Sequence, residues 1–228
     1  MAVSFCNLNL FEHPERLIPL AERTGLVKQL SLWVLKRVLQ QSSEWRKRGI
    51  DIGISINLSA QDLIDTDLPD VIAGLLANNN IPSGLLVLEI TETSIMKDPE
   101  RAMQILNRLH DMKVRISIDD FGTGYSSLSY LRQMPVSEIK IDRSFVIDML
   151  KNPSDEAIVQ ATIGLAQNLG LEVVAEGVED VDTLMRLRAM GCNLLQGYYI
   201  SHPLTAEELP AWHEEKRDNF LPEKDLPA

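Results

Sequence analysis

The sequence has few of the residues that build disulfide frameworks or soft-metal sites. Its 228 residues include only two cysteines, Cys6 and Cys192, which lie far apart in the chain and show no metal-ligand spacing. Disulfide scaffolds and zinc sites both need several closely spaced cysteines, so this composition argues against either. We expect both cysteines to be reduced thiols in a cytosolic protein.

Positive charge and long apolar runs are also scarce. Lys and Arg number 22 against 33 Asp and Glu, so the net charge is −11 and the pI is about 4.8. Non-specific binding to DNA, RNA or an anionic membrane needs a basic patch, and the composition argues against all three. The sequence has neither a secretory leader in residues 1–10 nor an apolar run of about 18 residues. We predict a soluble, cytoplasmic protein without membrane insertion.

Several familiar catalytic motifs are missing. The four histidines are scattered, and no Ser or Cys has a recognisable base nearby, so covalent acyl chemistry is unsupported. Gly122 and Gly124 are spaced as in a dinucleotide-binding loop, but Ser127 replaces the third glycine and two aspartates precede the loop. The triplet Asp120-Phe121-Gly122 lacks the other kinase motifs. What remains is a glycine loop that carries carboxylates, and such loops often gate sites.

What the sequence does contain is an alternation of short β-branched runs with longer segments of helical period. The predicted strands are residues 52–57, 85–90, 114–119, 138–141, 172–175 and 194–200. The predicted helices are residues 28–48, 68–79, 99–112, 154–169 and 182–190. Parallel strands need crossover connections, so the alternation predicts an α/β fold whose parallel sheet is either doubly wound or closed into a barrel. A seventh strand is expected within residues 2–10, and an eighth is not visible.

The length and the 45% apolar composition predict one domain of ordinary size over residues 1–228. Residues 216–228 are polar with two prolines, and we expect them to form a loose terminus.

Polar side chains recur where each predicted strand ends. They are Asn57, Glu89, Glu92, Asp119, Asp120, Lys140, Asp142, Glu176, Glu179 and Gln196. Any one of them alone is better explained as a turn or cap residue, but six consecutive strands repeat the pattern. In a parallel α/β fold this end of the sheet carries the active site. We therefore expect these residues to share one rim.

Carboxylates gathered on one rim need positive charge beside them. Two unit charges 4 Å apart repel by about 4 kcal/mol at an effective dielectric of 20. Oxygen ligands without His or Cys favour hard cations such as Mg²⁺ or Mn²⁺ over zinc. Lys140 adds one fixed charge, and the flanking Ile139 and Ile141 predict that Lys140 points into the barrel.

Six ordered motifs resemble those of bacterial EAL domains. They are Asn57-Leu58-Ser59, Leu88-Glu89-Ile90-Thr91-Glu92, residues 118–127, Lys140-Ile141-Asp142, Ala175-Glu176-Gly177-Val178-Glu179 and Gln196-Gly197-Tyr198. The resemblance runs from about Leu17 to Pro203. It implies a TIM-like (β/α) barrel that uses two Mg²⁺ or Mn²⁺ ions to hydrolyse the second messenger cyclic di-GMP to linear pGpG.

The resemblance also implies a role for each matching residue. Asn57, Glu89, Asp119 and Asp120 would be metal ligands. Lys140 and Glu176 would position and deprotonate the attacking water, and Glu92 would anchor the glycine loop. Gln196, Glu179 and Asp142 would contact the substrate. Paired metals agree with the expected chemistry, because they generate hydroxide near neutral pH and clamp both oxygens of an in-line displacement.

The first segment departs from the family pattern. Aligning the family's His-Pro on His13-Pro14 places Cys6 at the metal-binding glutamate of the Glu-Ala-Leu signature and Leu10 at its arginine. Residues 1–16 are therefore divergent, and we expect a barrel that is incomplete or altered at its first strands. A truncation, a mis-assigned start and a naturally degenerate domain would each produce this pattern.

Two functions stay open at this point. One is a phosphodiesterase impaired by the missing glutamate, and the other is an inactive module that binds cyclic di-GMP or a protein partner. A homodimer and a longer parent with sensory or GGDEF-type domains are both compatible with the sequence.

Overall fold

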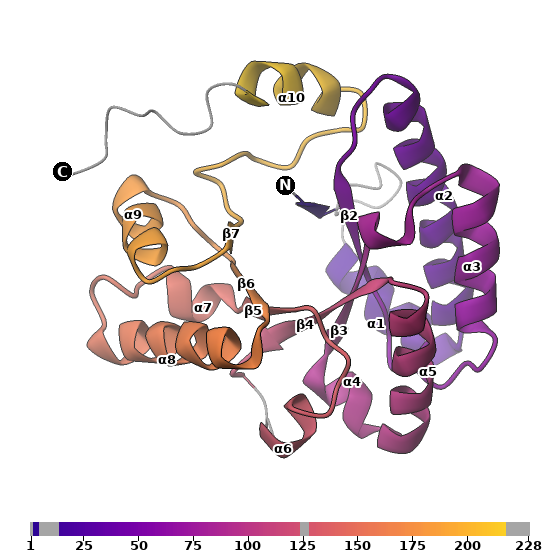
Figure 1. Ribbon diagram of the computed structural model, residues 1–228, viewed down its shortest axis with the longest axis horizontal. Helices are drawn as coiled ribbons and strands as arrows, with labels where there is room; N and C mark the ends of the chain where they lie inside the picture. The colour runs from indigo at the N-terminus through magenta and orange to yellow at the C-terminus, as the bar shows by residue number, and fades with distance from the viewer. Residues whose placement is uncertain (1, 5–13, 124–127, 218–228) are drawn as a thin grey trace.

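The computed structural model describes residues 2–4, 14–123 and 128–217, and Figure 1 shows their arrangement. Their strands form one parallel sheet in the order β1-β2-β3-β4-β5-β6-β7. The bounds are β1 (Ala2–Ser4), β2 (Gly53–Asn57), β3 (Leu86–Thr91), β4 (Arg115–Phe121), β5 (Glu138–Ile141), β6 (Glu172–Ala175) and β7 (Leu194–Leu195). In the described parts of the chain β7 does not pair with β1. The sheet is therefore an incomplete TIM-like barrel, which confirms the predicted fold class.

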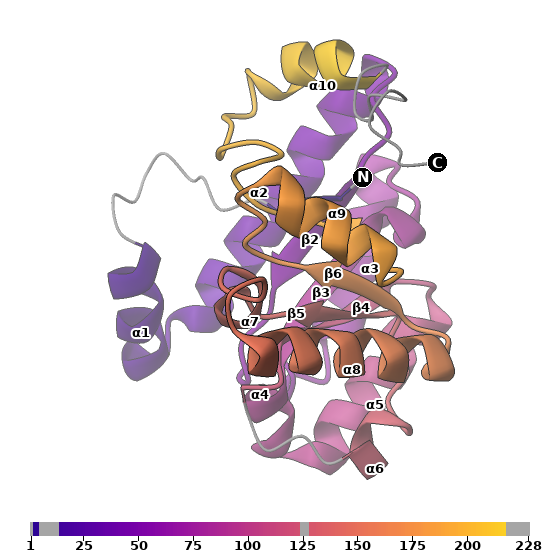
Figure 2. The same cartoon turned by 90° about the vertical axis from the view of Figure 1, so that its left-hand side faces the viewer.

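Helices follow most strands. The bounds are α1 (Pro14–Thr24), α2 (Val27–Lys47), α3 (Leu68–Asn79), η1 (Ser83–Leu85), α4 (Glu92–Met96), α5 (Pro99–Asp111), α6 (Leu128–Leu131), α7 (Arg143–Val146), α8 (Pro153–Leu169), α9 (Val181–Ala189) and α10 (Leu209–Arg217). Figure 2 shows α1 projecting from the body of the molecule beside α2. None of these helices has the length and apolar character needed to cross a membrane.

Capping residues explain where several helices begin. The side chain of Asp98 accepts a hydrogen bond from the backbone N–H of Arg101 at 3.2 Å, and Pro99 opens α5. Asn152 caps α8, and Asp180 caps α9 by accepting from the N–H of Thr183 at 2.7 Å. These short polar side chains satisfy backbone donors that have no partner within the helix.

Two apolar clusters hold the helices against the sheet. The first joins β2, β3 and β4 to α2, α3 and α5, and the second joins β4, β5 and β6 to α8 and α9. Strands β3 and β5 are buried along almost their whole length, as expected for parallel strands covered by helices. A third cluster joins α10 to α2 through Trp45 and Leu209, and the indole N–H of Trp45 donates to the carbonyl of Ala206 at 3.2 Å.

Charged residues close the amino-terminal end of the strands. Arg115 at the start of β4 pairs with Glu138 at 2.8 Å and also with Glu172. Glu138 is 3% exposed, and burial raises the pKa of its carboxyl even though Ser117 and Arg115 act in the opposite direction. This end of the barrel is opposite the rim where the candidate site residues lie.

The predictions for the last strand and for the chain termini differ most from the structure. The strand predicted over residues 194–200 ends at Leu195, because the chain from Gln196 onward turns: the N–H groups of Ile200 and Ser201 both donate to the carbonyl of Gly197. The strand expected within residues 2–10 is present as β1, and the rest of that range lies outside the described residues. Residues 216–217 of the expected loose tail belong to α10, and residues 218–228 also lie outside the described part.

Candidate metal centre and active site

Lys140 is the centre of the candidate site. It lies on β5 between Ile139 and Ile141, which are fully buried on the other face of the strand. Its Nζ lies 3.0 Å from Glu89 Oε2, 2.8 Å from Asp119 Oδ1 and 2.7 Å from Glu176 Oε1. The side chain is 5% exposed. The structure thus places Lys140 inside the barrel, as the sequence predicts, and joins β3, β4, β5 and the end of β6 through one cation.

The charges of this group depend on one another. Burial by itself opposes the charged form of Lys140, but the surrounding carboxylates of Glu89, Asp119 and Glu176 outweigh burial and raise the pKa of the amine. Lys140 is therefore a fixed cation at physiological pH. Burial raises the pKa of Glu176, although Lys140 partly offsets this effect. A buried carboxyl with a raised pKa beside a fixed cation is an arrangement that active sites often use for proton transfer.

A β-bulge brings Asp119 and Asp120 to the same rim. Consecutive residues of a regular strand point to opposite faces, but the pairing of β4 with β5 is irregular between Ile118 and Phe121. Within this bulge Asp120 has φ of 53°, a left-handed conformation that is uncommon for a residue with a side chain. Such strain is found mainly at functional sites.

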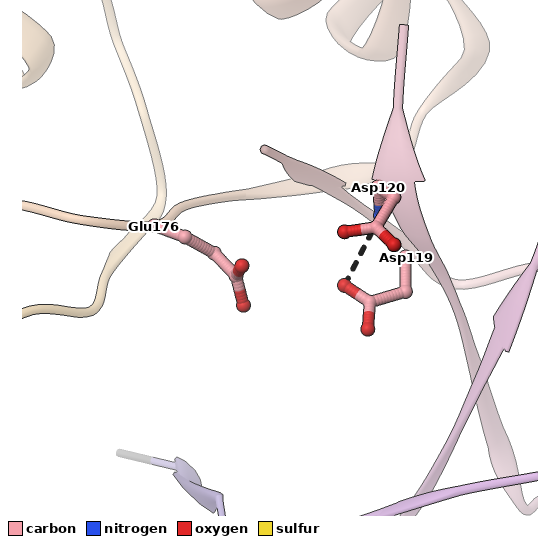
Figure 3. A group of neighbouring side chains, drawn as sticks. All are labelled: Asp119, Asp120 and Glu176. Carbon is pink, nitrogen blue, oxygen red and sulfur yellow. Dashed lines mark hydrogen bonds between the residues drawn. The ribbon is translucent and has the colours of Figure 1, made fainter. Parts of the chain in front are cut away.

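Three carboxylates meet at this rim. Asp119, Asp120 and Glu176 each offer an oxygen, and these oxygens all lie within 4.8 Å of one another. Figure 3 shows Asp119 and Asp120 side by side at the end of β4, with the Glu176 side chain reaching toward them and the N–H of Asp120 donating to Asp119 Oδ1 at 3.1 Å. Burial, followed by the charges of Asp119 and Asp142, raises the pKa of Asp120.

The donor set fits a hard divalent cation. All three side chains provide carboxylate oxygens, the ligands that Mg²⁺, Mn²⁺ and Ca²⁺ prefer. Lys140 contacts Asp119 and Glu176 but is shared among several acids, so it leaves net negative charge at the rim. A cation bound there would relieve this repulsion. The acidic cluster therefore has the chemistry and spacing to hold a metal ion.

The other predicted ligands lie beside this cluster. Glu89 on β3 pairs in register with Ser117 on β4, which lies two residues before Asp119. The side chain of Glu89 is almost fully buried against Lys140. Asn57 is paired with Glu89 in register and has an exposed side chain at the end of β2. The three-carboxylate group thus contains Glu176, for which the sequence predicts a catalytic role, while Glu89 is engaged by the lysine.

The predicted substrate contacts are spread around the rim. The N–H of Gln196 donates to the carbonyl of Ala175 at 2.8 Å, which places its backbone beside Glu176. Asp142 follows β5 and caps α7 by accepting from the N–H of Ser144 at 3.0 Å, and its charge helps to raise the pKa of Asp120. Burial opposes ionisation of Asp142, but the bonds from Ser144 lower the pKa of its carboxyl.

Glu179 and Glu92 occupy the starts of connections that leave the rim. Glu179 is exposed in the loop before α9, and Glu92 is half-buried as the first residue of α4. The glycine loop that Glu92 is expected to anchor includes residues 124–127, which lie outside the described part of the chain, as do Cys6 and Leu10. Those expectations remain predictions.

Gly197 has a structural role that the sequence reasoning missed. A Cβ atom on this residue would lie 2.1 Å from the carbonyl oxygen and 2.3 Å from the nitrogen of Val178. The N–H of Val178 donates to the carbonyl of Gln196 at 3.0 Å, and the N–H of Tyr199 donates to that of Val178 at 3.0 Å. The chain segments after β6 and β7 therefore cross in direct backbone contact, which only glycine allows.

The sequence is similar to a known domain family and to named bacterial proteins. The EAL domain family matches residues 7–203. A protein of Pseudomonas aeruginosa named as a cyclic di-GMP phosphodiesterase is 40% identical over 202 residues, which are 89% of this chain and 34% of that protein. The oxygen sensor protein DosP of Escherichia coli is 41% identical over 200 residues, covering 87% of this chain and 25% of DosP. The chain thus spans about a third or less of the length of these relatives.

Solved structures share the fold. A structure described as the PaMucR phosphodiesterase in complex with c-di-GMP superposes with a TM-score of 0.82 at 43% identity and covers 86% of this chain and 80% of that one. The EAL domain of Mycobacterium smegmatis DcpA gives a TM-score of 0.78 at 38% identity, with 83% and 86% covered. Together with the family match over most of its length, these likenesses show that the chain belongs to the EAL domain family, whose members include cyclic di-GMP phosphodiesterases.

Proposed function

We propose that this chain is a metal-dependent phosphodiesterase that hydrolyses cyclic di-GMP to linear pGpG. The observation that carries the proposal is the convergence of Asp119, Asp120 and Glu176 around the fixed charge of Lys140. The names of the relatives and the c-di-GMP complex of PaMucR support the substrate.

We assign the metal-binding role to Asn57, Glu89, Asp119 and Asp120, and propose two Mg²⁺ or Mn²⁺ ions as the cofactors. When bound, these ions would activate water and neutralise charge on the phosphodiester. The oxygens that Asp119 and Asp120 offer within 4.8 Å of each other support their part of this assignment.

The protein side chains would carry out positioning and proton transfer. Lys140 holds Asp119 and Glu176 in place through contacts of 2.8 Å and 2.7 Å. Glu176, whose pKa is raised, accepts a proton from water as the water oxygen bonds to phosphorus. The bond from phosphorus to one ribose 3′ oxygen breaks, and that oxygen takes up a proton. Gln196, Glu179 and Asp142 would contact the substrate, and Glu92 would anchor the glycine loop.

A turnover assay with cyclic di-GMP and Mn²⁺ tests the proposal. We expect formation of pGpG by the wild-type chain, and a loss of at least about 100-fold in Glu176→Gln, in line with the usual contribution of a general base. Glu207→Gln, a change of an exposed glutamate outside the rim, is the matched control. No product from a folded wild-type chain that binds Mn²⁺ and cyclic di-GMP would refute the hydrolytic role.

A binding module without turnover is the second candidate function. The feature that favours it is Cys6, which alignment on His13-Pro14 places at the family's metal-binding glutamate, because a thiol suits soft metals better than Mg²⁺ or Mn²⁺. This candidate predicts that cyclic di-GMP binds, measured by calorimetry, while pGpG does not accumulate.

We also propose the wider setting of the domain. Residues 1–228 would form a single cytoplasmic EAL-type unit, able to form a homodimer and to belong to a longer parent with sensory or GGDEF-type domains. The short share of each relative that the chain covers supports the longer parent.

A further inference from the structure

A buried carboxylate outside the candidate site links the end of β2 to α2. Asp62 is 2% exposed, and its Oδ2 accepts hydrogen bonds from the N–H of Ser59 at 2.8 Å, from the hydroxyl of Ser59 at 2.6 Å and from the hydroxyl of Ser31 at 2.8 Å. The N–H of Asp62 donates back to Ser59 Oγ at 3.3 Å. Ser31 is itself buried in α2. A single carboxylate oxygen therefore joins two distant elements.

A local turn accounts for only part of this arrangement. The reciprocal bonds between Ser59 and Asp62 have the form of a capping box, which fixes the chain within one turn. The bond from Ser31 comes from 31 residues earlier in the chain and adds nothing to that turn. Within the described part of the chain no Lys, Arg or His forms an ion pair with Asp62, so three hydrogen-bond donors are what stabilise a buried charge. Burying a charge in this way is costly, which argues for a function beyond the turn.

The carboxylate acts on the strand end that carries Asn57. Asn57 pairs in register with Glu89, and the N–H of the next residue, Leu58, donates to the carbonyl of Glu89 at 2.8 Å. The N–H of Ser59 then donates to Asp62. The backbone after Asn57 is therefore held by β3 on one side and by Asp62 with α2 on the other, and this backbone sets where the exposed amide of Asn57 lies.

We propose that Asp62, held by Ser31, is a positioning residue that fixes the Asn57 amide for binding a divalent cation. The inference deepens the proposed function and rests on its assignment of Asn57 as a metal ligand. Neither Asp62 nor Ser31 needs to contact the metal, because residues that orient ligands commonly change metal affinity about 10- to 100-fold when replaced.

Calorimetric titration of the full chain with Mn²⁺ tests this without relying on turnover. We expect Ser31→Ala and Asp62→Asn each to weaken Mn²⁺ binding by about tenfold. Ser42→Ala, which changes another buried serine of α2, controls for the first variant. Asp65→Asn controls for the second by removing one negative charge from the same segment, where Asp65 pairs with Lys28 at 3.0 Å. The Mn²⁺ affinity of both control variants should stay within about twofold of the wild-type affinity.

A double-mutant cycle with Asn57→Ala separates positioning from general stability. We expect Asn57→Ala to weaken Mn²⁺ binding and Ser31→Ala to have no further effect in that background, while Ser31→Ala still lowers the melting temperature. Equal losses in both backgrounds, or no loss from Ser31→Ala in the wild-type chain, would overturn the inference and leave the proposed function standing. Unchanged Mn²⁺ affinity in Asn57→Ala would remove the ligand assignment and the inference with it. If Asp62→Asn does not fold, the Ser31→Ala cycle decides alone.

Discussion

Replacing Lys140 by methionine tests the electrostatic centre of the barrel. The change keeps most of the side-chain volume but removes the cation that lies within 3.0 Å of Glu89, Asp119 and Glu176. These carboxylates have side chains that are only 3% to 17% exposed, so water screens little of their mutual repulsion. Removing one partner from a buried charge pair destabilises proteins by about 3 to 5 kcal/mol. For a chain of this length that free energy corresponds to a fall in melting temperature of roughly 6 to 20 °C.

Thermal unfolding with and without Mn²⁺ measures this effect. Without metal we expect Lys140→Met to melt well below wild type, because the three acids then lose the cation that they share. Added Mn²⁺ should raise the melting temperature of the variant more than that of wild type, since the ion would replace part of the missing charge. In metal-free buffer, a variant that melts within about 2 °C of wild type has lost no more than about 1 kcal/mol of stability. That result would refute the electrostatic role of Lys140.

Three further predictions test other parts of the structure. The pKa of Glu138 is raised, so the folded chain binds the carboxyl proton more tightly than the unfolded chain and loses stability as the pH rises through that pKa. Between the ordinary carboxyl pKa and neutral pH, the melting temperature of Glu138→Gln should therefore fall less than that of wild type. The same pH profile for both proteins would contradict this. Gly197→Ala should lower the melting temperature and pGpG formation, because the added Cβ would meet the backbone of Val178. Gly164→Ala, in a helix with open space around it, should instead stabilise the fold by about 0.5 to 1 kcal/mol. Equal effects of the two substitutions would contradict the backbone crossing at Gly197. Burial raises the pKa of the Cys192 thiol to about 11, so mass mapping should find it slow to alkylate at neutral pH until the chain unfolds, and fast labelling in the native state would oppose this.

The sheet and its rim were predictable because they depend on local patterns. β5 and β6 agree with their predicted bounds, and α3 agrees residue for residue, since apolar runs and polar ends coincide in these elements. The inward orientation of Lys140 followed from the isoleucines on either side of it. The short helices α4, α6 and α7 were not predicted, because one or two turns leave little periodicity to detect.

The details of the site depend on contacts between distant segments. The left-handed φ of Asp120 has no sequence signal, because it is imposed by the bulge between β4 and β5. The close approach of Glu176 to the two aspartates depends on how far apart β4 and β6 lie, and the sequence pattern does not give that distance. Asp62 carried a weak signal in the Ser-x-x-Asp spacing from Ser59, but its bond to Ser31 follows only from the packing of α2.

Anomalous diffraction from crystals grown with Mn²⁺ and cyclic di-GMP is the most direct test of a metal-dependent site at this rim. We predict two manganese peaks between the substrate phosphate and the side chains of Asn57, Glu89, Asp119 and Asp120, with Lys140 and Glu176 beside them. Manganese bound elsewhere, or cyclic di-GMP bound at the rim with no manganese peak near Asp119 and Asp120, would contradict the proposed function.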